Sequence, residues 1–157
     1  MKTLILGLGN PILGDDGIGL RVTESLRARL SGRDITVSES NASGLTLLDL
    51  LVGYDRAIII DAIQTEDGDI GEVYRLEVSD LNVTRHAASP HDVNLATALE
   101  LGKRLNLALP QQISIIAIEI PSACTFTEEC SPEVEKAIPL AVRMTLAILD
   151  EEYRNPL

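Results

Sequence analysis

The sequence has no tryptophan, one phenylalanine and three tyrosines, which excludes a core built mainly on aromatic packing. Its 157 residues are nonetheless 45% hydrophobic, so the core is aliphatic, as suits a sheet covered by helices. Two cysteines are too few for a disulfide framework, and no apolar run approaches the roughly 20 residues of a membrane-spanning helix. We therefore expect a soluble protein with a single domain over residues 1–157.

Basic residues are also scarce, with 13 Lys and Arg against 24 Asp and Glu and a net charge of -11. An acidic surface repels phosphate backbones and anionic lipids, so we expect no nucleic-acid or membrane partner. The charge serves solubility, or it attracts a basic partner or a cation. The N-terminus lacks the basic flank and cleavage site of a signal peptide, which predicts a cytoplasmic protein with reduced thiols.

Short apolar runs alternate with segments of helical periodicity along the chain. We expect strands at residues 3–9, 35–38, 56–63, 71–78 and 112–120, and helices from Ile18, over 44–51, from Ser89 and from Ser131. The segment at 71–78 alternates like an edge or antiparallel strand, and Pro139 should kink the last helix. The pattern predicts a three-layer α/β/α sandwich with a mostly parallel sheet of about five strands, one of them antiparallel.

Open α/β sheets bind ligands beyond the carboxyl ends of their strands, so polar residues at those positions are candidates for chemistry. Such residues are Asn10, Asp15 and Asp16 after the first strand, Asp61 closing the third strand, and His91 in the first turn of the third helix. They come from three segments that this topology can bring together.

Each candidate also has a structural interpretation. Asp15 is expected to be the N-cap of the first helix, which leaves Asp16 either to complement the helix dipole or to face the cleft. Asp61 ends an apolar run and needs a cation or several donors to stay ionised. His91 is either a surface residue or, with its pKa lowered by the helix N-terminus, a neutral metal ligand.

Two carboxylates and one imidazole, from Asp16, Asp61 and His91, form a donor set with room for outside ligands. A catalytic or exchangeable divalent site requires such room. Zinc, nickel, manganese and cobalt all accept these ligands, so the set does not select the metal.

The remaining reactive side chains give weaker patterns. Cys124 and Cys130 are six residues apart with no histidine nearby, so we expect ordinary thiols. His86 has no ligand spacing around it, although it could help to shape the mouth of the site. No GxSxG motif is present, so nucleophilic serine catalysis is not expected.

The segment GLGNPILGDDGIG at residues 7–19 partly matches a dinucleotide-binding loop. Gly7 and Gly9 fit that fingerprint, and Glu39 is placed to be its acidic residue, but Ile12 stands where the third glycine belongs. The two aspartates of this segment would repel a phosphate by like charge, so a dinucleotide-binding domain stays a minority alternative. GLGNP also resembles peptidyl-tRNA hydrolases, which carry an early histidine and a basic surface that this chain lacks.

Four segments in order, GLGNPILGDDGIG, IIIDAI, SPHDVNL and ECSPEVEKAI, closely resemble the hydrogenase maturation endopeptidases over nearly the whole chain. Those enzymes trim a C-terminal extension from the large-subunit precursor of a [NiFe] hydrogenase after nickel insertion. The family's nickel-contacting residues fall on Asp16, Asp61 and His91, and many members have Glu at the first of these positions. The resemblance implies that the partner is the precursor and that the precursor supplies the nickel ion.

The resemblance leaves two mechanisms open. Nickel polarises the scissile carbonyl or a water as a Lewis acid, or it anchors the precursor while Asp16 or Asp61 acts as general base, as in an aspartic-type peptidase. A nickel-binding maturation or delivery protein without proteolysis is the alternative function. Client specificity is expected in the loops at 64–71, 79–90 and 121–131.

Residues around the predicted donor set are expected to support it. Asn10 is expected to shape its loop or to donate a hydrogen bond to the substrate, and Gly44 to let a peptide pass close to the backbone. Ser89 and Asp92 form a capping box that would hold His91 in place.

Overall fold

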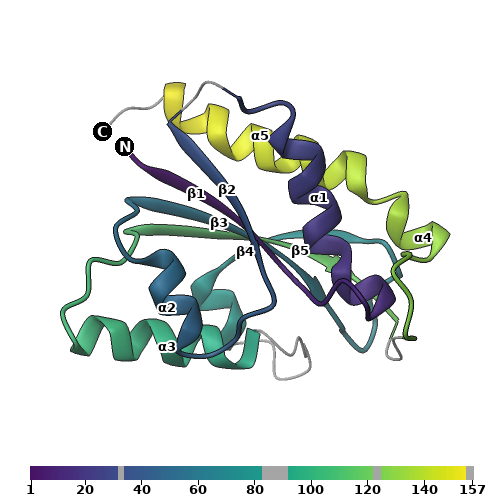
Figure 1. Cartoon of the computed structure of the whole chain (residues 1–157), viewed down its shortest axis with the longest axis horizontal. Helices are drawn as coiled ribbons and strands as arrows, with labels where there is room; N and C mark the ends of the chain where they lie inside the picture. The colour runs from purple at the N-terminus through teal and green to yellow at the C-terminus, as the bar shows by residue number, and fades with distance from the viewer. Residues whose placement is uncertain (32–33, 83–91, 122–124, 155–157) are drawn as a thin grey trace.

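A computed structural model of the chain describes residues 1–31, 34–82, 92–121 and 125–154. Five strands form one sheet in the order β2-β1-β3-β5-β4 (Figure 1). Their bounds are β1 Thr3–Leu8, β2 Ile35–Ser40, β3 Arg56–Ile63, β4 Val73–Glu77 and β5 Gln112–Glu119. Neighbouring strands are parallel except β4, which pairs with β5 in the antiparallel sense at one edge of the sheet. The predicted mostly parallel sheet with one antiparallel edge strand is confirmed.

Helices cover both faces of the sheet (Figure 1). Helices α1 and α5 lie on one face, and α2 and α3 on the other. The bounds are α1 Ile18–Arg27, α2 Thr46–Leu51, α3 Asp92–Arg104, α4 Pro132–Glu135 and α5 Ile138–Arg154, with short 3-10 helices η1 Gly14–Gly17 and η2 Val78–Asn82. The predicted three-layer α/β/α arrangement is confirmed. Across the described ranges, no helix combines the length and hydropathy needed to cross a membrane.

Strand β3 lies at the centre of the sheet and is buried along its whole length, as its apolar sequence predicts. Side chains along a strand alternate between faces. Ile58 and Ile60 pack with the α1 and α5 side, whereas Ile59 and Ile63 pack with the α2 and α3 side. Asp61 therefore projects toward the layer that contains α3.

The strand predicted at 56–63 is confirmed as β3, although Asp61 does not end it, because β3 continues to Ile63 through its pairing with β5. The predicted last helix is wrong in its extent. Pro139 does not kink one long helix. The chain instead forms two helices that break between Glu135 and Ile138. Pro139 is the second residue of α5, where a helix needs no backbone N–H donor.

Candidate active site

Asp16 lies in η1, directly after the loop that leaves β1, and only 5% of its surface is exposed. The backbone N–H of Asn10 donates to its Oδ2 at 2.8 Å, and its own N–H donates to the Leu13 carbonyl at 3.2 Å. A side chain at Gly9 would place Cβ 2.2 Å from the Asp16 carbonyl oxygen. The glycine thus lets the loop close tightly around Asp16.

Asp61 is the second carboxylate of the predicted set and is 1% exposed. Its Oδ1 accepts a hydrogen bond from the Ala62 N–H at 2.8 Å. Strand β3 neighbours β1 in the sheet, and η1 contacts β3. The structure thus brings the segments that carry Asp16 and Asp61 together at the carboxyl edge of the parallel strands.

His91, the third predicted member of the set, lies outside the described residues. Helix α3 begins at Asp92, and its Leu95 and Leu99 pack with Ile59 on the face toward which Asp61 projects. Among the described residues, no three His, Cys, Asp or Glu side chains are grouped so that they could hold a metal ion. His91, the third ligand of the predicted donor set, is not one of the described residues. Ser89, Pro90 and the predicted capping box also fall on undescribed residues.

Asp15 does not have its predicted role. Helix α1 has Gly17 as its N-cap, and no side chain caps it. The Asp15 carboxylate instead accepts hydrogen bonds from the backbone N–H of Ser131 at 2.6 Å and from the Ser131 hydroxyl at 2.9 Å. The interposed η1 turn moves Asp15 away from the start of α1. It therefore joins η1 to the residue preceding α4.

The loop after β5 is also tied to the Asp16 loop by main-chain hydrogen bonds. The N–H of Gly14 donates to the Thr127 carbonyl at 2.8 Å, and the N–H of Thr127 donates to the Ile12 carbonyl at 3.0 Å. Leu13 and Thr127 form a parallel bridge. These hydrogen bonds hold the two loops side by side next to Asp16.

Glu119 is a buried acid that the sequence analysis missed, although it ends the apolar run of β5 much as Asp61 ends IIID. It is 2% exposed and pairs in register with Ile63, while Asp61 pairs with Ala117. Glu119 and Asp61 therefore project from the same face. The Glu119 carboxylate accepts hydrogen bonds from the Thr65 N–H, at 3.1 Å to each oxygen, and from the Thr65 hydroxyl. It fixes the chain just after β3.

Tyr74 lies near the same cluster, and its hydroxyl donates to Glu72 Oε2 at 2.8 Å. Burial and this hydrogen bond raise the pKa of Tyr74 to about 12. The phenol is therefore protonated at neutral pH and acts as a donor that secures the segment leading into β4.

The other predicted candidates that lie among the described residues give no second site. Cys130 is half-buried, and burial raises the pKa of its thiol, which fits the expected ordinary thiol. Glu39, the acid of the dinucleotide alternative, forms a 3.2 Å ion pair with Arg27. Cys124 and His86 lie outside the described residues.

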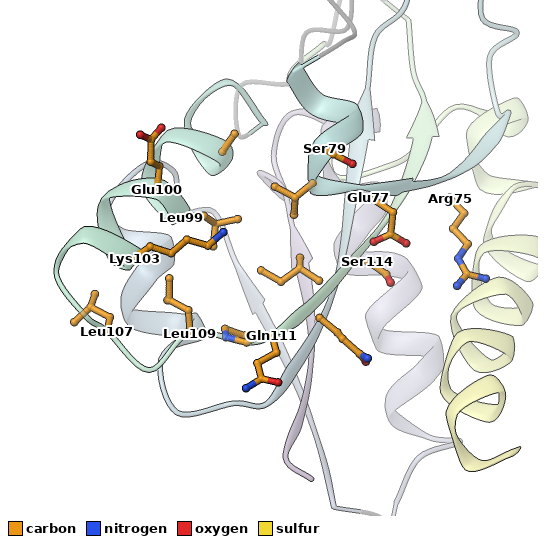
Figure 2. A pocket seen from close by; sticks show the side chains of 15 residues that line it. Arg75, Glu77, Ser79, Leu99, Glu100, Lys103, Leu107, Leu109, Gln111 and Ser114 are labelled. Carbon is orange, nitrogen blue, oxygen red and sulfur yellow. The ribbon is translucent and has the colours of Figure 1, made fainter. Parts of the chain in front are cut away.

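A cavity of about 900 Å³ lies between α3 and the end of β4 (Figure 2). Lys103 of α3, Glu77 of β4 and Ser114 of β5 line it, together with Gln111. It adjoins the amino-terminal end of β5, whereas Asp16 and Asp61 lie toward the carboxyl ends of β1 and β3. This cavity is separate from the two carboxylates.

Comparisons with known proteins agree with the fold. A family model described as HycI, hydrogenase maturation protease, matches residues 20–148, a range that includes Asp61 and His91 and begins after Asp16. The hydrogenase 2 maturation protease of Escherichia coli strain K12 is 29% identical over 153 residues, which span 96% of this chain and 92% of that protein.

Solved structures give the same result. The hydrogenase maturating endopeptidase HybD from Escherichia coli matches with a TM-score of 0.83 and 28% identity, covering 97% of this chain and 94% of that one. The [NiFe] hydrogenase maturation protease HybD from Thermococcus kodakarensis matches with a TM-score of 0.73 and 27% identity, covering 94% and 99%. With the family model matching most of its length, the chain belongs to the hydrogenase maturation protease family, a family of peptidases.

Proposed function

We propose that this chain is an endopeptidase that removes a C-terminal extension from the large-subunit precursor of a [NiFe] hydrogenase once the precursor holds nickel. The observation that carries the proposal is two buried carboxylates, Asp16 and Asp61, at the ligand-binding edge of a sheet in a member of this family. Nickel enters as part of the substrate, so the enzyme acts on loaded precursor.

We assign contact with the substrate's nickel to Asp16, Asp61 and His91. Carboxylate oxygens and imidazole nitrogens are ligands that nickel accepts. Burial disfavours the charged form of a carboxylate, and an adjacent cation favours it. The buried state of Asp16 and Asp61 therefore supports a site whose ionisation and substrate binding reinforce each other.

Peptide hydrolysis needs a water oxygen to attack the scissile carbonyl carbon, a base to accept the water proton, and a proton for the amine as the C–N bond breaks. The substrate's nickel polarises the carbonyl, or it anchors the precursor while Asp16 or Asp61 accepts the proton. Both routes use the same side chains. They differ in whether losing one side chain weakens binding or slows the reaction.

The test incubates the purified chain with nickel-loaded and nickel-free precursor and weighs the products by mass spectrometry. We expect loss of a C-terminal peptide only with nickel. Replacement of a site residue, in Asp16→Asn, Asp61→Asn or His91→Ala, should lower the rate at least about 100-fold. Asp150→Asn, at an exposed position on α5, is the matched control and should stay within about twofold.

Unchanged precursor mass in both conditions contradicts the proposal for that precursor. Transfer of nickel without cleavage instead supports the delivery alternative. A variant that binds loaded precursor normally but cleaves it slowly identifies the general base. A variant that no longer binds identifies an anchoring ligand.

A further inference from the structure

Large apolar side chains are exposed at the same edge of the sheet as Asp16 and Asp61. Each described loop that follows the carboxyl end of a parallel strand exposes one. These residues are Ile12 after β1, Leu45 after β2, Ile70 after β3 and Phe126 after β5. Exposed apolar residues also occur toward the opposite end of the sheet, so the position of these four beside the two carboxylates is what makes them candidates for a binding surface.

Two of these side chains come from loops that are joined by hydrogen bonds. Leu13 and Thr127 form a parallel bridge between the loops, and the N–H of Thr127 donates to the Ile12 carbonyl at 3.0 Å. Ile12 and Phe126 each directly precede a residue of that bridge, so their backbones lie close together. Phe126 is the only phenylalanine of the chain and is 86% exposed, while Ile12 is 50% exposed. We call these two residues the apolar pair.

The apolar pair is connected directly to the loop that holds Asp16. The N–H of Ile12 donates to Asn10 Oδ1 at 3.1 Å, and the N–H of Asn10 donates to the Asp16 carboxylate. Asn10 thus shapes the loop, one of its two predicted roles. A segment bound on the apolar pair would lie against the turn that positions Asp16.

Charge indicates which kind of segment would bind there. Glu128 and Glu129 follow Phe126 and are both exposed, in a chain with a net charge of -11. Arg21 donates to the Glu128 carbonyl oxygen and brings one positive charge to the loop, while the two glutamates bring two negative charges, so the loop keeps a net negative charge. Such a surface complements an apolar side chain flanked by Lys or Arg.

We propose that Ile12 and Phe126 form a docking surface for the protein substrate, which seats an apolar side chain next to basic residues beside Asp16. The inference rests on the proposed function, because the substrate is the large-subunit precursor. It adds a binding surface of this chain's own that is separate from the contacts to nickel.

The test measures binding and cleavage of nickel-loaded precursor from the organism that produces this chain. The variants are Phe126→Ala, Ile12→Ala and the double variant, and Leu105→Ala is the control because Leu105 is 59% exposed and follows the far end of α3. We expect the double variant to raise Kd and KM at least about tenfold, with kcat and Tm nearly unchanged. The Leu105→Ala variant should match the wild type.

Equal precursor affinity of the wild type and the double variant overturns the docking surface, even if cleavage by the wild type supports the proposed function. A wild type that binds but does not cleave contradicts the function, while lost affinity in the double variant still supports docking. If the double variant abolishes a dimer in sedimentation and leaves precursor affinity intact, the surface serves a second copy of the chain and the inference is wrong.

Discussion

At the scale of single residues, the adjacent carboxylates of Asp15 and Asp16 have different surroundings. Asp15 accepts two hydrogen bonds from Ser131, whereas Asp16 is buried and accepts a hydrogen bond from the Asn10 N–H. Asp15→Ala removes the acceptor for both Ser131 donors. We expect it to lower the free energy of unfolding, measured by urea denaturation, by about 1–3 kcal/mol.

Two variants control this prediction. Asp15→Asn keeps one acceptor oxygen and should lose less stability than Asp15→Ala. Asp150→Ala removes an exposed carboxylate and should change stability by no more than about 0.5 kcal/mol. If Asp15→Ala is as stable as Asp150→Ala, the link between η1 and Ser131 does not stabilise the fold.

At the scale of elements, α1 approaches the sheet closely because it carries a glycine where it crosses β1 and β3. A Cβ at Gly19 would lie 2.4 Å from the carbonyl oxygens of Leu8 and Ile60. Alanine normally favours a helix over glycine by about 1 kcal/mol. Here the clash involves strand backbone that cannot yield, so we expect Gly19→Ala to lower the unfolding free energy by about 2 kcal/mol or more.

The matched control is Gly102→Ala in the last turn of α3. Its added Cβ would meet the flexible side-chain ends of Leu109 at 2.7 Å and Leu48 at 3.0 Å. Those ends can rotate, so the change should stay within about 1 kcal/mol of the wild type in the same urea measurement. Equal losses at both glycines would show that close backbone approach is not what requires Gly19.

The sequence predicts the elements that depend on local pattern. Apolar runs, together with the alternation at 71–78, locate all five strands, and helical spacing from Ile18 locates α1. It also places Asp16 and Asp61 at the carboxyl edge, because that position follows from strand direction. Contacts between distant segments leave no local signal. The partner of Asp15 is Ser131, 116 residues away.

Glu119 also shows which features follow from local pattern and which need contacts between distant segments. Its position at the end of an apolar run resembles that of Asp61, so the pattern that identified one acid identifies the other. Its structural partner, the backbone and hydroxyl of Thr65, is 54 residues away and needs the folded sheet. Pattern therefore locates both buried acids, and the hydrogen bonds from Thr65 to Glu119 in the folded sheet identify Glu119 as a structural acid.

At the scale of the whole molecule, the two ends of the sheet differ in chemistry. The carboxyl edge carries the buried carboxylates and the apolar pair, whereas the cavity of about 900 Å³ lies toward the opposite end. With a net charge of -11, long-range attraction favours a basic partner. Such attraction raises the rate of encounter and leaves the chemical step unchanged.

Cleavage of the precursor should therefore depend on salt in a particular way. Raising NaCl from about 50 to about 500 mM should lower kcat/KM roughly tenfold, with kcat nearly constant, because screening slows encounter. Initial rates over a range of substrate concentrations measure both constants. The Glu128→Gln, Glu129→Gln double variant removes two exposed charges beside Phe126 and should show a lower kcat/KM at low salt and a shallower salt dependence. Equal salt dependence in the wild type and the double variant would show that these two glutamates do not attract the substrate.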